Sequence, residues 1–451
     1  MKISRVFPIT VVLLSALLLL ISLVGCTPQA DARQDNKVQT SETAQEETPS
    51  VSIEDTASPS MGAAISELPN ETVETPSPLP EIQGSGEIAY SNGVTPLTPE
   101  QEALLQAYMD TAYESLARLE EPDFTALFSD ETQAQASQSG IVMQIEIRQF
   151  IDGVDYSLTG YFYSLDCQSV RTSEDGSIAV GAIESSVQNF TQTPGIDSEQ
   201  SGTFHHFVLE ELDGNWYIRE HMRYDTLYGQ LMQQGGNQGG WGSLAQQYID
   251  AVPAYLEEMR SAHAERTAQW GLTEALPAAE QPYDREAALA YADQYALTRS
   301  SEWVDYSRSG GNCQNYVSQC LLAGGIPMDP YGGAVWKWYD GNLSETPGAS
   351  GRSRSWAGVQ SFVAYVRNNT GYGLVAQVDA PYYSGQSGDL LEMGTKDALR
   401  HTVIIRDLVL DADGLTVDYL VNSNTTDMRN YPASLYGYSQ FVLTRIAGWN
   451  T

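Results

Sequence analysis

The chain has 451 residues and a strongly acidic composition, in which 23 lysines and arginines face 58 aspartates and glutamates, for a formal net charge of −35 at pH 7. This charge argues against nucleic acid and anionic lipid headgroups as partners, because both are themselves strongly negative. The four cysteines, Cys26, Cys167, Cys313 and Cys320, form neither a disulfide framework nor a close-spaced metal pattern.

The amino terminus has the layout of a secretory signal. Lys2 and Arg5 precede an apolar run over residues 6–24. The run is long enough to cross a bilayer, so a retained signal-anchor helix is the alternative. The end of the run, Leu-Val-Gly-Cys26, resembles the bacterial lipobox, which implies cleavage before Cys26 and lipid on its thiol. We therefore expect residues 1–25 to be a signal peptide, and the rest of the chain to be anchored by lipid on the outer face of a bacterial cell membrane.

Residues 26–97 predict an acidic tether. The segment is rich in Ser, Thr, Pro, Glu and Gln and contains few large apolar residues. Such a composition cannot bury enough surface to offset the entropy lost on ordering. We expect a disordered, fairly extended linker between the membrane and the folded regions.

Residues 98–270 predict a smaller α+β domain. Thr98-Pro99-Glu100 is a helix-start signal, and apolar residues follow it at helical spacing. One helix followed by a curved meander is similar to the ketosteroid-isomerase-like cone fold. A helix over 255–270 and a short linker over 275–282 complete the region. Alternating segments predict antiparallel strands over residues 141–150, 157–165, 178–192, 204–212 and 216–222.

Three histidines, His205, His206 and His221, fall on these predicted strands. Neighbouring strand residues point to opposite faces, so His205 and His206 cannot easily share one metal ion. No further ligand is identifiable from the pattern. We therefore expect ordinary strand histidines and no metal site.

A cysteine at the start of a helix is the strongest functional signal. Gly310-Gly311-Asn312-Cys313 runs from a glycine-rich loop into an apolar helical pattern that ends at Gly324-Gly325. At a helix start, free N–H groups and the helix dipole stabilise a thiolate, and the same groups can hold an oxyanion. The competing nucleophile, Cys320, lies two turns inside the helix, where a buried thiol is hard to ionise. We expect Cys313 to be the nucleophile.

A cysteine nucleophile needs a base, and one histidine, His401, follows residue 282. His401 opens a β-branched run that predicts a buried strand. A polar group must then fix the orientation of the imidazole. Asn422 and Asn424 fall on one face of the next predicted strand, over 415–424, and either residue can take this role.

These residues together resemble the putative amidase domain family, a relative of the NlpC-type and CHAP-type cell-wall peptidases in the papain-like superfamily. The resemblance covers residues 282–451. It implies a papain-like α+β fold, in which a helix bearing Cys313 packs on an antiparallel sheet bearing His401. It rests on an ordered set of residues: Tyr283, Arg285, Cys313, Asn315, Val317-Ser318-Gln319, Gly324-Gly325, Ser355-Trp356, Gly388-Asp389 and His401.

Two departures from the family pattern concern the site. Asn312 and Gln314 flank Cys313 where the family has Asp and Thr, and Asn424 stands where a histidine is often found. The second departure makes Asn424 the preferred orienting residue over Asn422.

We therefore expect covalent amide hydrolysis through a thioester, without a cofactor. The expected substrate is peptidoglycan or another peptide, and we expect the protein to act as a monomer. Two alternatives remain: a non-catalytic cell-wall-binding or assembly lipoprotein, and an acyltransferase with the same Cys-His chemistry. Nearby aromatic residues are candidates for a substrate groove or, equally, for the core: Trp303, Tyr306, Trp336 and Trp356.

Overall fold

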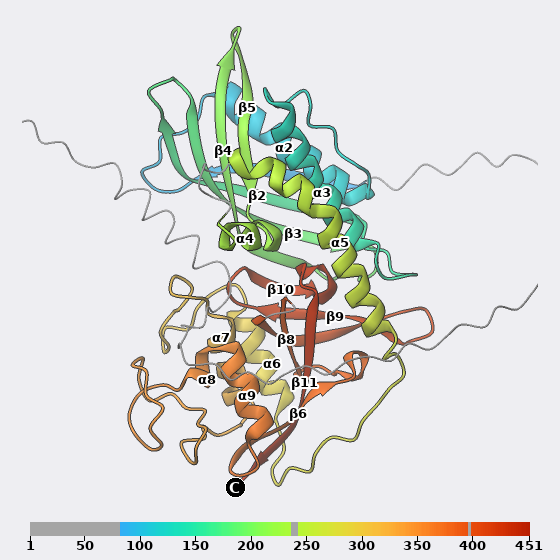
Figure 1. Cartoon of the computed structure of the whole chain (residues 1–451), viewed down its shortest axis with the longest axis vertical. Helices are drawn as coiled ribbons and strands as arrows, with labels where there is room; N and C mark the ends of the chain where they lie inside the picture. The colour runs from blue at the N-terminus through green and yellow to red at the C-terminus, as the bar shows by residue number, and fades with distance from the viewer. Residues whose placement is uncertain (1–81, 236–241, 396–397) are drawn as a thin grey trace, which may run out of the picture. The chain divides into compact units, whose positions relative to one another are not determined.

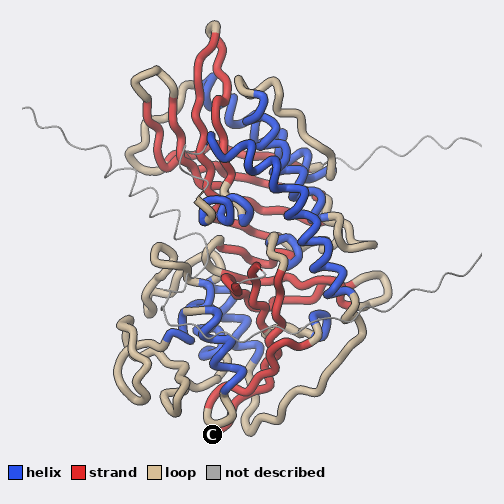
Figure 2. The backbone as a smooth tube through the Cα atoms, viewed as in Figure 1, coloured by secondary structure: helices blue, strands red, loops and turns tan. Residues whose placement is uncertain are grey.

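The computed structural model describes residues 82–235, 242–395 and 398–451 (Figure 1). The expected signal peptide, the lipidation site at Cys26 and most of the expected tether lie outside these ranges. Helices and strands occur along the whole described chain, which confirms the α+β class (Figure 2). No helix within the described ranges combines the length and apolar character needed to cross a membrane.

The first half of the described chain contains five strands and four α-helices, with a short 3-10 helix, η2, at Gly242–Leu244. Helices α2, α3 and α5 pack together against the sheet formed by the strands (Figure 1). The elements in chain order are β1 (Gln83–Tyr90), α2 (Pro99–Arg118), α3 (Glu131–Arg148), β2 (Leu158–Thr172), β3 (Ile178–Phe190), β4 (Ser198–Leu212), β5 (Asn215–Arg223), α4 (Thr226–Gln233) and α5 (Ala245–Thr267).

The second half contributes a group of helices and then six strands (Figure 1). Two short 3-10 helices, η3 (Tyr382–Ser384) and η4 (Ala433–Tyr436), interrupt the strands. The main elements are α6 (Arg285–Tyr295), α7 (Cys313–Ala323), α8 (Arg354–Ala357), α9 (Val359–Asn368), β6 (Gly373–Ala380), β7 (Leu390–Thr395), β8 (Ala398–Leu410), β9 (Thr416–Ser423), β10 (Asp427–Pro432) and β11 (Gln440–Asn450).

Helix α2 begins where the sequence predicts. The Thr98 hydroxyl accepts a hydrogen bond from the Gln101 N–H, and the Gln101 side chain accepts one from the Thr98 N–H, so both members of a capping box are present. Pro99 occupies the first turn, where its missing N–H costs nothing. The helix ends at Leu119 in a left-handed conformation with φ of 55°.

Residues 141–148 belong to helix α3, so the predicted strand over 141–150 is wrong. Ile141 and Ile145 pack into the cluster beneath β2 and β3, whereas Met143 and Ile147 pack against α5 and α4. Helix α3 is therefore buried on two sides. Burial at every second residue imitates the period of a strand, and the pattern alone cannot separate the two.

The expected tether ends earlier than predicted, because β1 pairs in parallel with β2. The glycines that make this segment look unstructured have a packing role. A Cβ added at Gly84 or Gly86 would stand only 2.2 Å from the ring of Tyr161 or 2.0 Å from that of Tyr163. Only glycine allows the strand to lie this close to the two rings.

All the strands form one sheet, in the order β1-β2-β3-β4-β10-β9-β8-β7-β11-β6, with β5 paired to β4. The central seam is the antiparallel pairing of β4 with β10, where Gln200 lies opposite Met428. Across the seam, Ser198 donates a 2.7 Å hydrogen bond to the carbonyl of Asn430. The two expected domains, 98–270 and 282–451, therefore share a continuous sheet.

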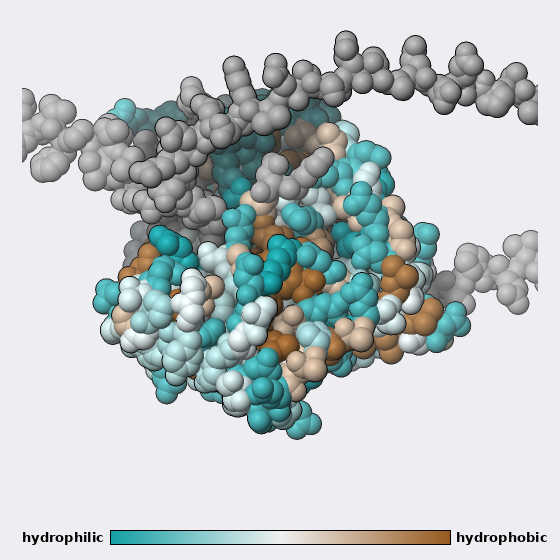
Figure 3. Space-filling model, turned by 60° about the horizontal axis from the view of Figure 1, so that its bottom comes forward, coloured by the Kyte–Doolittle hydropathy of each residue, from teal (hydrophilic) through white to brown (hydrophobic). Residues whose placement is uncertain are grey.

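Alternation along β8 divides its side chains between two cores. Ile404 packs with Val317 and Leu321 of α7, whereas Val403 and Ile405 pack on the opposite face of the sheet. The outer surface in Figure 3 carries several separate groups of hydrophobic residues among hydrophilic ones.

One buried carboxyl group lies inside this sheet. Glu392 is 0% exposed, accepts a 2.8 Å hydrogen bond from the Thr444 hydroxyl, and lies opposite Thr402. Its second oxygen and the Thr402 hydroxyl have no hydrogen-bond partner in the described part of the chain. Burial raises the pKa of Glu392 from 4.5 to about 8, so the carboxyl is neutral at pH 7.

This raised pKa predicts a loss of stability with rising pH. Above pH 4.5 the unfolded state ionises while the folded state stays neutral, so the penalty grows until the pH passes about 8. We expect Glu392→Gln to remove this dependence and to be more stable than the wild type at pH 7 by roughly 3 kcal/mol. Thermal and denaturant unfolding between pH 5 and 8 would measure the effect, with the exposed Glu302→Gln as control. Parallel pH curves for the wild type and Glu392→Gln would contradict the prediction.

Candidate functional site

Cys313 is the first residue of α7, as the glycine-rich loop predicts, and it is fully buried. The side chain of the preceding Asn312 does not cap the helix. It makes three other side-chain hydrogen bonds instead: it accepts from the Tyr306 N–H at 3.2 Å and from the Asn315 amide of the same helix at 2.9 Å, and it donates to Asn424 at 3.0 Å. The helix thus starts without a side-chain cap beside the thiol, which suits an oxyanion.

None of the three described cysteines is in a disulfide, and all three are buried. Burial raises the pKa of the Cys320 thiol well above its ordinary value of 9.0, and that of Cys167 to about 12. A thiol that stays protonated is a poor nucleophile. Two of the three cysteines are therefore unsuited to covalent catalysis.

His401 lies in β8 opposite Met393 and is 5% exposed. Burial lowers the pKa of its imidazole to about 4, so the ring is neutral at physiological pH, and the same burial disfavours the imidazolium that forms when the ring takes a proton. Its Nε2 has no hydrogen-bond partner among the described residues. The ring lies 5.3 Å from that of Tyr436 and 6.3 Å from that of Tyr438, centroid to centroid.

A β-bulge lies immediately before His401. His401 is opposite Met393, but Leu399 is opposite Gly394. The neighbouring residues Met393 and Gly394 of β7 therefore pair with two residues of β8 that have one residue between them. Arg400 is the extra residue. A bulge re-aims side chains, and here Arg400 and His401 both line one cavity, although neighbouring residues of a regular strand would face opposite sides.

Both candidate orienting residues use their amides elsewhere. Asn424 donates 2.8 Å hydrogen bonds to the carbonyls of Tyr295 and Ala296, besides accepting from Asn312. Asn422 donates a 2.8 Å bond to Asp293 and accepts one from the backbone at position 430. Asn424 thus fixes the residue before Cys313, and the orientation of His401 by either asparagine stays a prediction.

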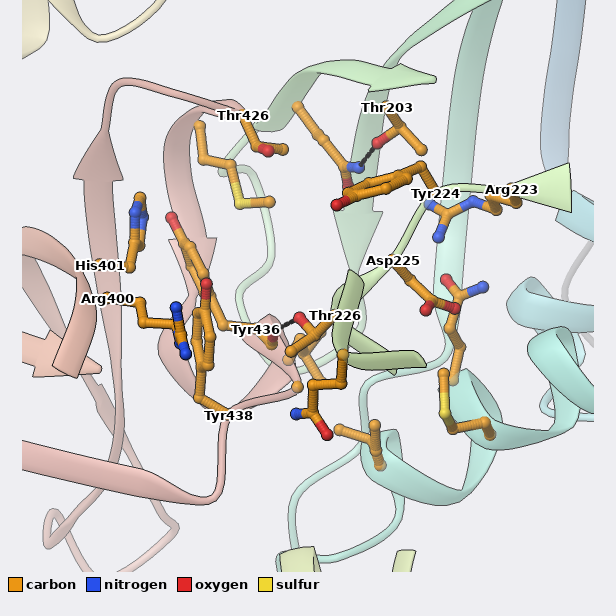
Figure 4. Close-up of a pocket in the computed structure, with 18 of the residues that line it drawn as sticks. Thr203, Arg223, Tyr224, Asp225, Thr226, Arg400, His401, Thr426, Tyr436 and Tyr438 are labelled. Atoms are coloured by element: carbon orange, nitrogen blue, oxygen red, sulfur yellow. Dashed lines mark hydrogen bonds between the residues drawn. The ribbon is translucent and has the colours of Figure 1, made fainter. Parts of the chain in front are cut away.

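The cavity beside His401 has a volume of about 170 Å³ (Figure 4). Arg400, His401 and Tyr438 line one side of it, and Arg223 and Asp225 line the other (Figure 4). Cys313 is not among the residues that line it.

The thiol nevertheless lies just behind this wall. Thr425, which lines the cavity, accepts a 2.5 Å hydrogen bond from the Asn312 N–H. Tyr436, which also lines it, has a pKa raised above its ordinary value by burial and in part by the nearby Cys313 thiol. Cys313 and His401 therefore both lie near Tyr436, at the end of β9.

The four aromatic candidates do not line this cavity. Trp336 and Trp356 are both 0% exposed, with stacked rings 4.9 Å apart, so of the two roles expected for them the structure gives the core and not the substrate groove. Their indole nitrogens donate to Ser318 and Asn315 of α7, which makes them structural supports of the cysteine helix. The partly exposed Trp303 ring stacks on that of Trp356, and the partly exposed Tyr306 ring packs against Trp338.

Two histidines that were expected to be ordinary strand residues, His205 and His221, belong to a second buried polar cluster. Ser137 Oγ lies 2.8 Å from His221 Nδ1, His221 Nε2 lies 3.1 Å from His205 Nδ1, and His205 Nε2 lies 2.8 Å from Glu184. The pairing of β4 with β5 brings the two histidines together, which spacing along the chain does not reveal. Arg223 Nε also donates to Glu184, at 3.2 Å.

Burial lowers the pKa of both histidines in this cluster, so they are neutral at pH 7. Burial acts to raise the pKa of Glu184, but the charge of Arg223 and the hydrogen bond from His205 outweigh it, and the net pKa is well below the usual range. No group of three or more side chains suited to a metal ion occurs in the described ranges.

Comparison with known proteins places the family signal in the second half of the chain. Residues 282–445 match the family model described as "Putative amidase domain". An uncharacterized protein of Bacillus subtilis (strain 168), YhbB, is 32% identical over 180 residues, a stretch that covers 38% of this chain and 48% of that protein. The chain thus spans about half the length of this relative. No solved structure gives a significant match. Residues 282–445 form an amidase-like domain.

Proposed function

We propose that the protein is a papain-like cysteine hydrolase that cleaves amide bonds, with Cys313 as nucleophile and His401 as base. The observation that carries this proposal is the convergence at the end of β9. There an uncapped helix start bearing a thiol lies behind the wall of a cavity that a neutral, buried imidazole lines. The match to the putative amidase domain supports amide bonds as the target.

The reaction follows from these groups. His401 takes the proton of the Cys313 thiol, and the sulfur forms a bond to the amide carbonyl carbon, while N–H groups at the start of α7 hold the oxyanion. The tetrahedral species expels the amine, which receives the proton from His401, and a thioester remains. Water then attacks the thioester with His401 again as base, and the acid and the free thiol are released.

One structural condition governs this chemistry. His401 shares the face of β8 that Val403 and Ile405 occupy, whereas α7 packs on the other face. A direct contact between Cys313 and His401 therefore has to be made past the end of β9, where Thr425 and Tyr436 stand. A substrate carbonyl that reaches the sulfur from this cavity would have to pass the wall that Thr425 and Tyr436 form.

The complete burial of Cys313 favours one competing function. A thiol that is 0% exposed and absent from the cavity lining also fits a binding or assembly lipoprotein that retains the fold without turnover. Under either function we propose that the protein is held outside the cell by lipid on Cys26. Peptidoglycan peptides are then the first amide substrate within reach of the tether.

Product analysis tests the proposed function. The full-length chain would be incubated with purified peptidoglycan, with and without an added primary amine, and the released fragments analysed by mass spectrometry. Hydrolysis predicts fragments with a new carboxylate and a new amine, and acyl transfer predicts fragments joined to the added amine. Absence of any release by well-folded protein would favour the binding function.

A further inference from the structure

We propose that the cavity beside His401 binds a carboxylate through Arg400 and Arg223, and that the amide substrate carries this carboxylate. The inference rests on the proposed function for the identity of the substrate, but the binding site itself stands on separate observations. It deepens the function from amides in general to amides that bear an acidic group.

Arg400 supplies the first cation. The bulge at Arg400 directs its side chain into the cavity beside His401, as Figure 4 shows. No hydrogen bond or ion pair joins its guanidinium to any residue in the three described ranges. A guanidinium offers a planar pair of N–H donors that matches the two oxygens of a carboxylate.

Arg223 supplies the second cation from the opposite side of the cavity. Its Nε is held by Glu184 at 3.2 Å, and Glu184 is itself fixed by His205 and Tyr113. The side chain of Arg223 is only 19% exposed, so its direction is set by this buried cluster. Since Nε is the atom committed to Glu184, the terminal nitrogens remain as donors toward the cavity.

The acidic groups near the cavity leave Arg400 unpaired. Glu184 offsets the charge of Arg223 but bonds only its Nε, and Arg223 makes no other side-chain hydrogen bond to the described residues. Asp225 lines the cavity, yet its carboxylate is occupied by the Tyr228 N–H at 2.8 Å and the Tyr248 hydroxyl at 2.6 Å. Burial also raises the pKa of Asp225 above its ordinary value. Arg400 is therefore the cation without an acidic partner on the cavity wall.

Because the chain as a whole is strongly negative, the position of these two arginines decides where an acidic ligand can bind. A protein with a net charge of −35 repels anions over most of its surface, so an acidic ligand gains affinity only where arginines are concentrated. The adjacency of Arg400 and His401 along β8 sets the distance between the anchored carboxylate and the scissile carbonyl. The site thus selects a short amide with an acidic group close to the bond that is cleaved.

A pair of neutral and acidic probes tests the inference directly. We would measure binding of N-acetyl-glycyl-glycine, which ends in a carboxylate, and of N-acetyl-glycyl-glycinamide, which does not, by ligand-observed NMR titration. The full-length Cys313→Ala protein would be used so that neither probe is consumed. We expect the acidic probe to bind about tenfold more tightly, a difference typical of one charge-assisted pair.

Variants assign the preference to the cavity. Arg400→Gln should remove the preference, and Arg400→Lys should keep part of it, because lysine retains the charge but not the paired donors. Arg308→Gln, an exposed arginine outside the cavity, is the matched control and should bind like the parent. Circular dichroism and the melting temperature of each variant would show whether it is folded.

Two results would overturn the inference: equal binding of both probes by the parent protein, or a preference that survives in folded Arg400→Gln. The failure of the proposed function looks different. If the wild-type chain releases nothing from peptidoglycan yet prefers the acidic probe through Arg400, the carboxylate site stands and the hydrolase assignment falls.

Discussion

Replacing Cys313 with alanine should lower amide hydrolysis by on the order of 10³-fold or more, because the residue supplies the attacking atom and no second nucleophile stands beside it. Cys320→Ala is the matched control, since Cys320 lies in the same helix and is equally buried. It should leave the rate within a few-fold of the wild type, provided the core tolerates the smaller side chain. Fragment release from peptidoglycan, normalised to folded protein, measures both rates.

The same variants separate catalysis from binding. A thiol-directed probe should label the wild type and Cys320→Ala more completely than Cys313→Ala, and labelling should fall in His401→Ala if His401 takes the thiol proton. Equal hydrolysis by Cys313→Ala and the wild type would exclude the covalent mechanism. Labelling that appears only after denaturation would indicate that Cys313 is closed to substrates, as in the binding function.

Removing the charge at Glu184 should cost the protein about 3–5 kcal/mol of stability, because Glu184→Ala leaves the guanidinium of Arg223 buried beside no counter-charge. The carboxylate also accepts hydrogen bonds from His205 and Tyr113, and both donors lose their partner. The stability of Glu184→Gln should lie between that of the wild type and that of Glu184→Ala, because glutamine keeps a hydrogen-bond acceptor but not the charge. Denaturant titration monitored by circular dichroism gives the free energy of unfolding.

Glu199→Gln is the control for this prediction. Glu199 pairs with Arg429 across the seam of β4 and β10, but that pair is partly exposed, and we expect a loss below about 1 kcal/mol. The pH dependence gives a second check. The pKa of Glu184 is lowered by folding, so its stabilisation is present above the unfolded value of 4.5 and is lost as the pH falls through the folded value. Equal losses in Glu184→Ala and Glu199→Gln would contradict the assigned role.

The local elements of the amidase-like domain were predictable because their signals are local. Glycines at 310–311 and 324–325 bracket α7, and the β-branched run after His401 forms β8. The turn over 411–414 leads into β9, whose bounds differ from the predicted ones by one residue at each end. In each case a change in residue type marks the end of the element.

The predictions that failed concern segments whose conformation depends on tertiary packing. Helix α3 has burial on two sides, which a one-sided amphipathic pattern does not describe. Strand β1 depends on glycines that fit against two tyrosine rings more than seventy residues away. Trp336 and Trp356 were left between a substrate groove and the core, because closeness to Cys313 in sequence does not separate rings that bind substrate from rings that hold the helix in place.

The candidate site was predictable only in part. Cys313 and His401 were proposed from residue type and context, but the far side of the cavity, with Arg223 and Asp225, depends on how β4 meets β10. The signal that was available and not used is the arginine directly before His401. This arginine, Arg400, lines the cavity because of the bulge, and no sequence pattern in this chain predicts that bulge.

The shared sheet has a consequence for how the protein can be divided. β10 is an inner strand because β4 covers one of its edges, so a fragment that begins after α5 would present the backbone N–H and C=O groups of β10 to any other strand. Such an open edge promotes aggregation between copies. The same cut would remove the wall of the cavity that carries Arg223. The first half of the folded chain therefore covers one edge of the sheet of the amidase-like half. A fragment of residues 282–451 should differ from the whole chain both in solubility and in ligand selection.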